Sequence, residues 1–236
     1  MYEHIPQRLA EIRNRIADAA GRAGRLPESV RLIAVSKTHP FDAVRAAADA
    51  GQLDFGENKV QEALPKIAQS ADPSLRWHLI GHLQSNKAKK AAPAVHAIHA
   101  IDSVDLLQKV DQAAAATGHA LDVLVQVDLA IEETKHGATV DLVPQIFAAA
   151  DHCRAARLVG LMLLPPLAEN PEDARPWFAR LRGLRDQLAE SGVPPARLRE
   201  LSMGMSHDFA VAIEEGATMV RVGTAIFGAR DYGKNE

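Results

Sequence analysis

Apolar and polar positions change their period along the chain, and the first segment has the period of a helix. Charged residues there alternate with apolar residues spaced three or four positions apart, which predicts an amphipathic helix with one buried face. The apolar positions are Ile5, Leu9, Ile12 and Ile16. Gly21 and Gly24 are expected to end this helix, because glycine is unfavourable inside helices.

From Arg31 onward, short apolar runs alternate with segments of helical period. The runs that predict strands are Leu32–Lys37, Leu53–Asn58, Trp77–Gly81, Ala97–Asp102, Val123–Asp128, Leu158–Leu163, Glu200–Gly204 and Met219–Gly223. The segments that predict helices are Phe41–Ala50, Lys59–Gln69, Ser85–Ala92, Val104–Thr117, Val140–Cys153, Asp173–Ser191 and Asp208–Glu215. This alternation predicts an α/β fold, a parallel sheet closed into a (β/α)₈ TIM-type barrel with an extra N-terminal helix. A doubly wound open sheet is the alternative, but eight units within 236 residues favour closure. Because no linker-like segment interrupts the pattern, we expect residues 1–236 to form a single domain.

The composition excludes several classes of protein. Hydrophobic residues make up 47% of the chain, which is enough for a large core, and a net charge of −3 supplies no basic field for nucleic acid. No apolar run approaches the ~18 residues that a membrane span requires. The single cysteine, Cys153, excludes an intrachain disulfide and fits a reducing compartment. We therefore expect a cytoplasmic protein with no nucleic-acid or membrane partner. A monomer is the expected assembly, although the composition does not bear on it.

The first predicted strand ends on a lysine. The residues before Ser36 are apolar and rich in branched side chains, which is typical of a strand covered on both faces, and Pro40 then begins the next helix. Lys37 is therefore delivered to the carboxyl edge of the sheet, where the active sites of barrels and open α/β sheets lie. A solvated lysine at a strand end is the other interpretation of this stretch alone.

Two segments near the end of the chain combine glycine and hydroxyl residues after a strand. Leu201–Ser206 closes the seventh strand, and Arg221–Gly228 closes the eighth. Each segment offers backbone N–H groups ahead of a helix without bulky side chains, which is what an anion needs. In barrels the phosphate site commonly lies in the loops after strands seven and eight. Ser206, Gly223 and Thr224 are therefore candidate phosphate ligands.

Two further strand ends carry polar side chains. Asn58 follows the second strand and is a candidate ligand, although it would also serve as the cap of the next helix. His78 and His82 are four positions apart, but they straddle a strand end and a glycine. They cannot share a helical face, so the spacing does not favour a zinc site.

Closure of the barrel would bring the two ends of the sheet together. The eighth strand then pairs with the first, so a phosphate held near Gly223 would lie within one cofactor length of Lys37. A phosphate beside a strand-end lysine indicates pyridoxal 5′-phosphate (PLP) held as a Schiff base. Strand alternation places Arg221 on the same face as Gly223, where its guanidinium can donate to a pyridine nitrogen but cannot accept from it. An ion pair between Arg221 and a carboxylate inside the barrel is the alternative role.

Six motifs in this order resemble the pyridoxal phosphate homeostasis protein family, which is similar to the N-terminal barrel of alanine racemase. The motifs are AVSKTHP, FGENKVQE, WHLIGHLQSNK, VQVDLAIEETKHG, LSMGMSHD and VRVGTAIFGAR. The resemblance covers nearly the whole chain and implies a barrel of PLP fold type III. It also implies that Lys37 forms the Schiff base, that the Ser206 and Gly223–Thr224 region binds phosphate, and that Arg221 lies near the ring nitrogen. Members of the family bind PLP without established turnover and act in vitamin B6 and amino-acid balance.

Two classes of function follow for this chain. One is a non-catalytic PLP carrier, with PLP-dependent apo-enzymes as its recipients, and the other is an amino-acid racemase. A two-base racemase needs an acid–base group opposite the lysine, usually a tyrosine, and this chain has only Tyr2 and Tyr232, both near the termini. The carrier is therefore favoured. Lys135, after the fifth strand, is a candidate second amine that receives the aldehyde, or a loop lysine that balances Glu132 and Glu133.

Overall fold

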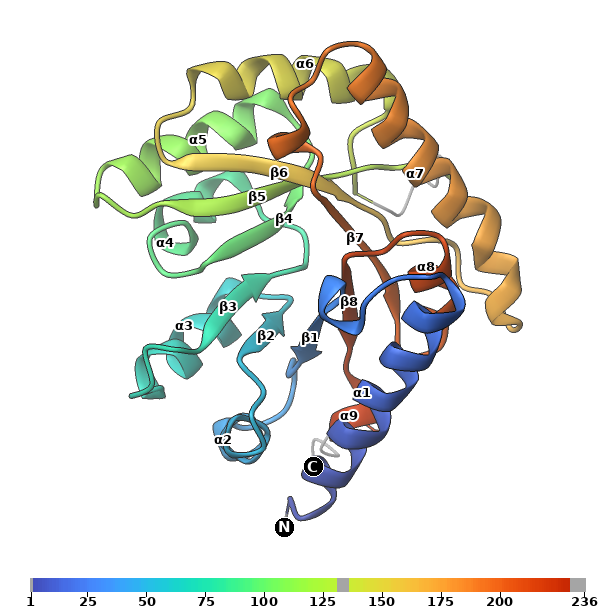
Figure 1. Ribbon diagram of the computed structural model, residues 1–236. Helices are drawn as coiled ribbons and strands as arrows, with labels where there is room; N and C mark the ends of the chain where they lie inside the picture. The colour runs from blue at the N-terminus through green and yellow to red at the C-terminus, as the bar shows by residue number, and fades with distance from the viewer. Residues whose placement is uncertain (1, 131–135, 230–236) are drawn as a thin grey trace.

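A computed structural model describes residues 2–130 and 136–229, and its centre is a closed barrel of parallel strands. The strands follow one another around the barrel in chain order, and β8 pairs with β1 (Figure 1). Their bounds are β1 Arg31–Val35, β2 Asp54–Glu57, β3 Arg76–Leu79, β4 Ala97–Ile101, β5 Leu121–Gln126, β6 Ala156–Met162, β7 Glu200–Met205 and β8 Met219–Val222. The predicted eight-stranded closed barrel is confirmed, and the doubly wound alternative is wrong.

Helices surround the barrel, and several of them differ from the prediction at their ends. The α-helices are α1 His4–Arg22, α2 Phe41–Asp49, α3 Val60–Gln69, α4 Ala88–Ala91, α5 Val104–Ala115, α6 Val143–Ala149, α7 Arg175–Glu190, α8 Phe209–Glu214 and α9 Thr224–Phe227. Short 3₁₀ turns are η1 Pro27–Ser29, η2 Ser85–Lys87, η3 Val140–Leu142, η4 Ala150–His152, η5 Pro171–Ala174 and η6 Pro195–Arg197. Three predicted helices thus begin or end as 3₁₀ turns. Gly21 lies within α1 rather than ending it, and Gly24, with a φ of 66°, follows the helix.

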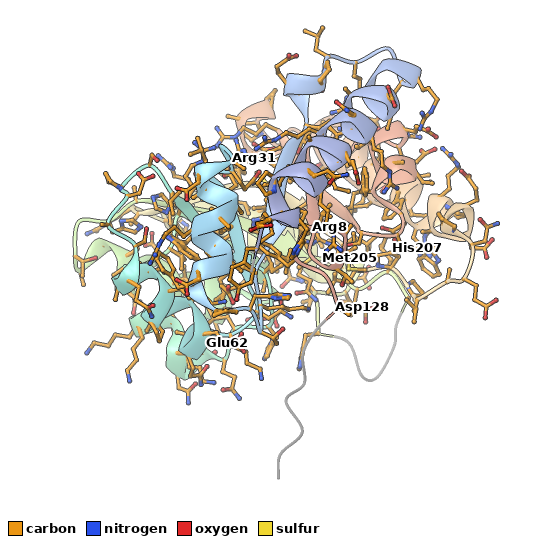
Figure 2. The ribbon with its side chains drawn as sticks, turned by 90° about the horizontal axis from the view of Figure 1, so that it is seen from below. Arg8, Arg31, Glu62, Asp128, Met205 and His207 are labelled. Atoms are coloured by element: carbon orange, nitrogen blue, oxygen red, sulfur yellow. The ribbon has the colours of Figure 1, made fainter. Side chains whose placement is uncertain are left out.

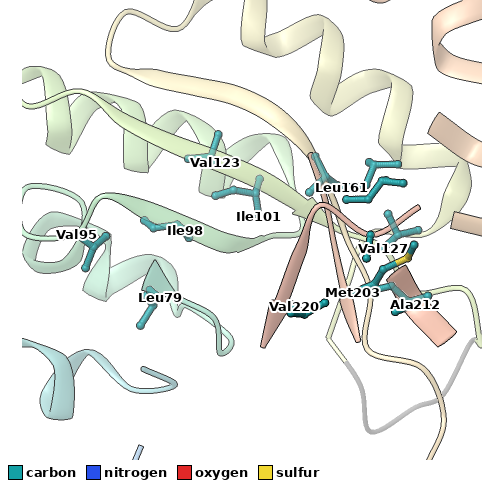
Figure 3. Packing of buried hydrophobic residues seen from close by; sticks show 14 of the residues in the cluster. Leu79, Val95, Ile98, Ile101, Val123, Val127, Leu161, Met203, Ala212 and Val220 are labelled. Carbon is teal, nitrogen blue, oxygen red and sulfur yellow. The ribbon is translucent and has the colours of Figure 1, made fainter. Parts of the chain in front are cut away.

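Strand alternation divides the apolar side chains into two groups. One group points outward and packs against the surrounding helices; Figure 3 shows Met203 of β7 beside Ala212 of α8 in this layer. A second, smaller group fills the inside of the barrel and consists of Ile33, Leu124, Val159, Met162 and Met219. The rest of the interior is polar, because several inward positions near the barrel axis carry buried histidine, serine, aspartate and arginine.

The N-terminal helix covers the outside of the barrel where the sheet closes. α1 packs against α8, α9 and α2, the helices that flank β8 and β1 (Figure 1). Its predicted apolar stripe is buried, and on the exposed side the Nε of Arg22 forms an ion pair with Glu214 of α8 at 2.8 Å. Within residues 2–130 and 136–229, no helix combines the length and the apolar composition that a membrane span needs.

Candidate functional site

A cavity of about 650 Å³ opens at the carboxyl ends of the strands. The predicted site residues all line this cavity: Lys37, Asn58, Ser206, Arg221, Gly223 and Thr224. They come from the ends of β1, β2, β7 and β8, which the closed sheet brings together. In Figure 2, Asp128, Met205 and His207 mark this end of the barrel, and Arg31 marks the amino end of β1. The carboxyl edge is therefore where the structure gathers the candidate chemistry.

The backbone around Lys37 is held by one helix. The Nζ of Lys66, on α3, donates to the carbonyl oxygen of Ser36 at 2.8 Å. One helical turn earlier, Glu62 accepts a hydrogen bond from the backbone N–H of Thr38 at 3.0 Å. Thr38 has a φ of 68°, a left-handed conformation that is uncommon for a branched residue and turns the chain away from the strand. Two side chains of α3 thus fix the residues on both sides of Lys37.

The Lys66 ammonium is part of a buried charged group that the sequence analysis missed. Its Nζ forms an ion pair with Glu57 Oε1 at 2.6 Å, and the hydroxyl of Ser36 donates to the same oxygen at 2.6 Å. The other oxygen of Glu57, Oε2, is buried and has no protein partner among the described residues. Burial raises the pKa of Glu57, in opposition to the hydrogen bonds from Lys66 and Ser36.

The loops after β7 and β8 present unpaired donors to the cavity. The backbone N–H groups of Ser206, His207 and Thr224, three residues that line the cavity, donate to no acceptor in the described part of the chain. Ser206 and Thr224, which carry hydroxyl groups, both line the cavity. A cluster of donors, with no carboxylate among the lining residues within 2–130 and 136–229, suits a multiply charged oxyanion.

Gly223 lines the cavity and also joins the loops after β7 and β8. Its N–H donates to the Oγ of Ser206 at 3.2 Å, which ties the two loops together. A Cβ at this position would lie 3.1 Å from the carbonyl oxygen of Val35 and 3.3 Å from the Val35 Cβ. The space that glycine leaves is therefore occupied by β1 and brings the ends of β8 and β1 together.

Arg221 is buried beneath the cavity, with 3% of its surface exposed. Its Nη1 donates to the Oγ of Ser202 at 2.6 Å, and its Nη2 donates to the carbonyl of Leu163 at 2.8 Å. Burial lowers the pKa of the guanidinium to about 10, so it is still charged at neutral pH. No carboxylate pairs with it among the described residues, so the ion pair considered as its alternative role is not formed.

His78 and His82 point to different parts of the molecule. His82 lines the cavity, where its ring stacks on that of His136 with centroids 3.6 Å apart, and its Nδ1 lies 3.6 Å from Asp102 Oδ2. His78 instead points into the barrel and is buried. No group of three or more potential metal ligands occurs in the described ranges. Lys135 lies outside the described residues.

Comparison with known proteins identifies the family. Two curated relatives are called pyridoxal phosphate homeostasis protein. The one from Aquifex aeolicus is 42% identical to this chain, over 96% of this chain and 98% of the relative. The one from Pseudomonas aeruginosa is 44% identical to this chain, over 97% of both. This chain belongs to the pyridoxal phosphate homeostasis protein family. The family profile described as alanine racemase, N-terminal domain, matches residues 8–231.

Solved structures show the same relationship at two distances. The structure of PipY from Synechococcus elongatus with PLP bound has a TM-score of 0.83 and 40% identity, covering 95% of this chain and 100% of that one. An alanine racemase from Clostridium difficile has a TM-score of 0.72 and 17% identity, covering 94% of this chain and 56% of that one. The second likeness shows the shared barrel fold only.

The raised pKa of Glu57 makes a prediction about stability. A carboxyl group whose pKa rises on folding stabilises the fold below its ordinary value of 4.5, and this contribution is lost as pH rises through the raised value. The free energy of unfolding of the wild type relative to Glu57→Gln should therefore decrease as pH rises above 4.5. Urea denaturation at several pH values measures this difference. Glu190→Gln, at the exposed end of α7, is the control; a flat or rising difference for Glu57 would contradict the assignment.

Proposed function

We propose that this chain binds PLP in the cavity at the carboxyl ends of the strands and acts in PLP and amino-acid homeostasis as a carrier without catalytic turnover. The observation that carries the proposal is the meeting of a lysine, a cluster of anion donors and a buried arginine on one cavity. Family membership and the PLP-bound structure of PipY support it. The eight-stranded barrel would then work as a single cofactor-binding domain.

The residues of the cavity fit the three parts of PLP. Lys37 supplies the primary amine, and the free N–H groups of the β7 and β8 loops, with the hydroxyls of Ser206 and Thr224, match a phosphate dianion. Asn58 supplies a further polar group at the rim. When bound, PLP supplies an aldehyde that condenses with an amine and an aromatic ring that can take up electrons.

Arg221 bears on whether the site turns over a substrate. A charged guanidinium can donate to a ring nitrogen but has no lone pair with which to accept from it, so it cannot hold that nitrogen protonated. A ring kept in this state withdraws electrons weakly. Arg221 would therefore favour holding the cofactor over removing a proton from an amino acid, which agrees with a carrier.

A racemase would also need an acid–base group across the cavity from Lys37. Tyr2 packs against the outer apolar core rather than lining the cavity, and Tyr232 lies outside the described residues. His78 is turned into the barrel, which leaves His82 as the histidine of the earlier pair that could contribute. Relatives of this chain are named for PLP homeostasis, and alanine racemase shares only the fold. We accordingly propose a monomeric, cytoplasmic carrier that supplies apo-enzymes, and Lys135 stays a predicted second amine.

The role of Lys37 can be tested by removing its amine. Lys37→Ala should abolish the yellow absorption band of the PLP-loaded protein and its shift on borohydride treatment, with an unchanged circular dichroism spectrum. Lys109→Ala, which removes an exposed lysine of α5 paired with Asp105, should keep both properties. A Lys37→Ala protein that keeps an unchanged band would place the attachment site elsewhere.

The phosphate cradle predicts a loss of affinity that depends on the phosphate. Ser206→Ala combined with Thr224→Val should weaken PLP binding by about 1–3 kcal/mol, because backbone N–H groups are left in place. Binding of pyridoxal, which has no phosphate, should change little. Equilibrium titration with both ligands measures this contrast, and Thr117→Val, in the turn after α5, is the control. Equal losses for the two ligands would argue against phosphate binding at these hydroxyls.

The carrier role predicts delivery of PLP to another protein. Loaded protein is mixed with an apo-enzyme that requires PLP, in the presence of a small-molecule trap for free PLP. Recovery of the apo-enzyme's activity despite the trap is expected for direct transfer. If the trap abolishes this recovery, the protein is a buffer that releases free PLP. In a separate assay, racemisation of amino acids by the purified protein would instead show an enzyme.

A further inference from the structure

A column of hydrogen bonds runs through the interior of the barrel from the cavity to the opposite end. Arg221 Nη1 donates to Ser202 Oγ at 2.6 Å, and Ser202 Oγ lies 2.9 Å from the Nδ1 of His99. The Nε2 of His99 lies 3.0 Å from the Nδ1 of His78, whose Nε2 lies 2.9 Å from Asp54 Oδ1. These residues come from β8, β7, β4, β3 and β2 in turn.

Every member of the column is shielded from solvent, and its two ends lie at separate cavities. None of the five residues has more than 4% of its surface exposed. Arg221 lines the cavity at the carboxyl ends, and Asp54 lines a second cavity of about 360 Å³ at the amino ends. There Arg76 donates to both oxygens of Asp54, at 2.8 and 2.5 Å. The column thus links a cation beneath the first cavity to an ion pair at the second.

The donor and acceptor roles within the column follow from the chemistry of its groups. A neutral imidazole has one donor and one acceptor nitrogen, and an ionised carboxylate only accepts. His78 must therefore donate to Asp54 through Nε2 and accept through Nδ1. His99 must then donate through Nε2 and accept at Nδ1 from the hydroxyl of Ser202. Ser202 in turn accepts from Arg221, so each hydrogen in the column points away from the cavity and has an acceptor.

The reverse arrangement leaves a proton without a partner. If His78 carried a second proton, its Nδ1 would donate to His99, and the Nδ1 of His99 would donate to Ser202. The Ser202 oxygen would then accept two hydrogen bonds, and its own hydrogen would have no acceptor within the column. The arrangement that satisfies every group is the one with both histidines neutral.

Electrostatics at the two ends agrees with this arrangement. Burial is the main cause that holds the pKa of His99 well below its ordinary value, and the nearby charge of Arg221 acts in the same direction. Burial acts to raise the pKa of Asp54, but hydrogen bonds from Arg76 and His78 hold it well below its ordinary value. The charged and titratable groups that face the column from the surrounding strands are Arg31 on β1, Asp54 on β2, Arg76 on β3, Glu200 on β7 and Arg221 on β8, with His96 before β4 and Asp208 before α8.

We propose that Ser202, His99 and His78 are positioning residues that hold Arg221 in one orientation beneath the PLP cavity and keep its charge directed toward the ligand. The column occupies Nη1 of Arg221, and the carbonyl of Leu163 occupies Nη2, so two donors of the guanidinium are fixed and the group cannot rotate. This inference rests on the proposed function, because it assigns the orientation of Arg221 toward bound PLP.

The first test needs no cofactor. Nitrogen-15 NMR of the histidine rings in the unloaded protein should show His99 and His78 as neutral tautomers with the proton on Nε2 at neutral pH, assigned by comparison with His99→Phe and His78→Gln. An Nδ1-protonated or doubly protonated His99 in the wild type would overturn the column as described. This result is independent of whether the protein binds PLP.

The second test breaks the column next to Arg221. Ser202→Ala should raise the dissociation constant for PLP about tenfold, the effect of removing one hydrogen bond to a charged group. It should also move the absorption maximum of the loaded protein and the pH dependence of that band. Ser202→Thr, which keeps the hydroxyl, should restore both. Met203→Leu, a change of similar volume on the outward face of the same strand, is the control.

A third test asks whether the whole column, and not only the contact between Ser202 and Arg221, holds the guanidinium. His99→Phe keeps a ring of similar volume but cannot accept from Ser202, and it should move the band and its pH dependence in the same direction as Ser202→Ala. Unchanged affinity and spectrum in both variants would overturn the positioning role. If the wild type fails to bind PLP, the proposed function fails, and the NMR test still decides the column by itself.

Discussion

The hydrogen bonds between β8 and β1 are the contact on which the site depends. Residues more than 180 positions apart in sequence become neighbours through this pairing, with Ile33 beside Arg221 and Ala34 beside Val222. Without it, Lys37 and the donors of the last loop would lie at opposite edges of an open sheet. Closure has a steric requirement at the seam, where Gly223 leaves room for Val35. It is supported from outside by α1, which packs over the helices on both sides of the seam.

The sequence supports prediction of features that depend on local pattern. Strand alternation and the end of each apolar run place Lys37, Ser206, Arg221 and Thr224 at the carboxyl edge, and the structure gathers them on one cavity. The contacts that hold these residues could not be predicted, because they join segments with no shared pattern. Lys66 reads as an ordinary helix-surface lysine, yet it is buried against Glu57 and the backbone of Ser36. The 3₁₀ turns at several helix ends likewise reflect packing rather than composition.

The interior of the barrel combines two kinds of packing. Five buried apolar side chains fill part of it, and the column of hydrogen-bonded polar groups lies in the rest. Burying polar groups is unfavourable unless each finds a partner. Here the partners are other members of the column, together with the carbonyl of Leu163 beside Arg221 and the guanidinium of Arg76 beside Asp54. His78 is considered from sequence only through its spacing from His82, which does not show that its side chain enters the barrel. Its inward direction follows from its register with β2 and β4, which a single strand cannot reveal.

The attachment of α3 to the backbone on both sides of Lys37 has a consequence for motion. Proteins open in local units, and the free energy of each opening depends on which elements move together. Lys66 and Glu62 lie on one helix and contact residues 36 and 38. The segment that follows β1 therefore cannot detach from the barrel without also breaking contacts of α3. The lysine and the helix therefore form one cooperative unit. The backbone of Lys37 therefore stays in place until α3 opens locally. The two side chains that impose this, Lys66 and Glu62, do not line the cavity.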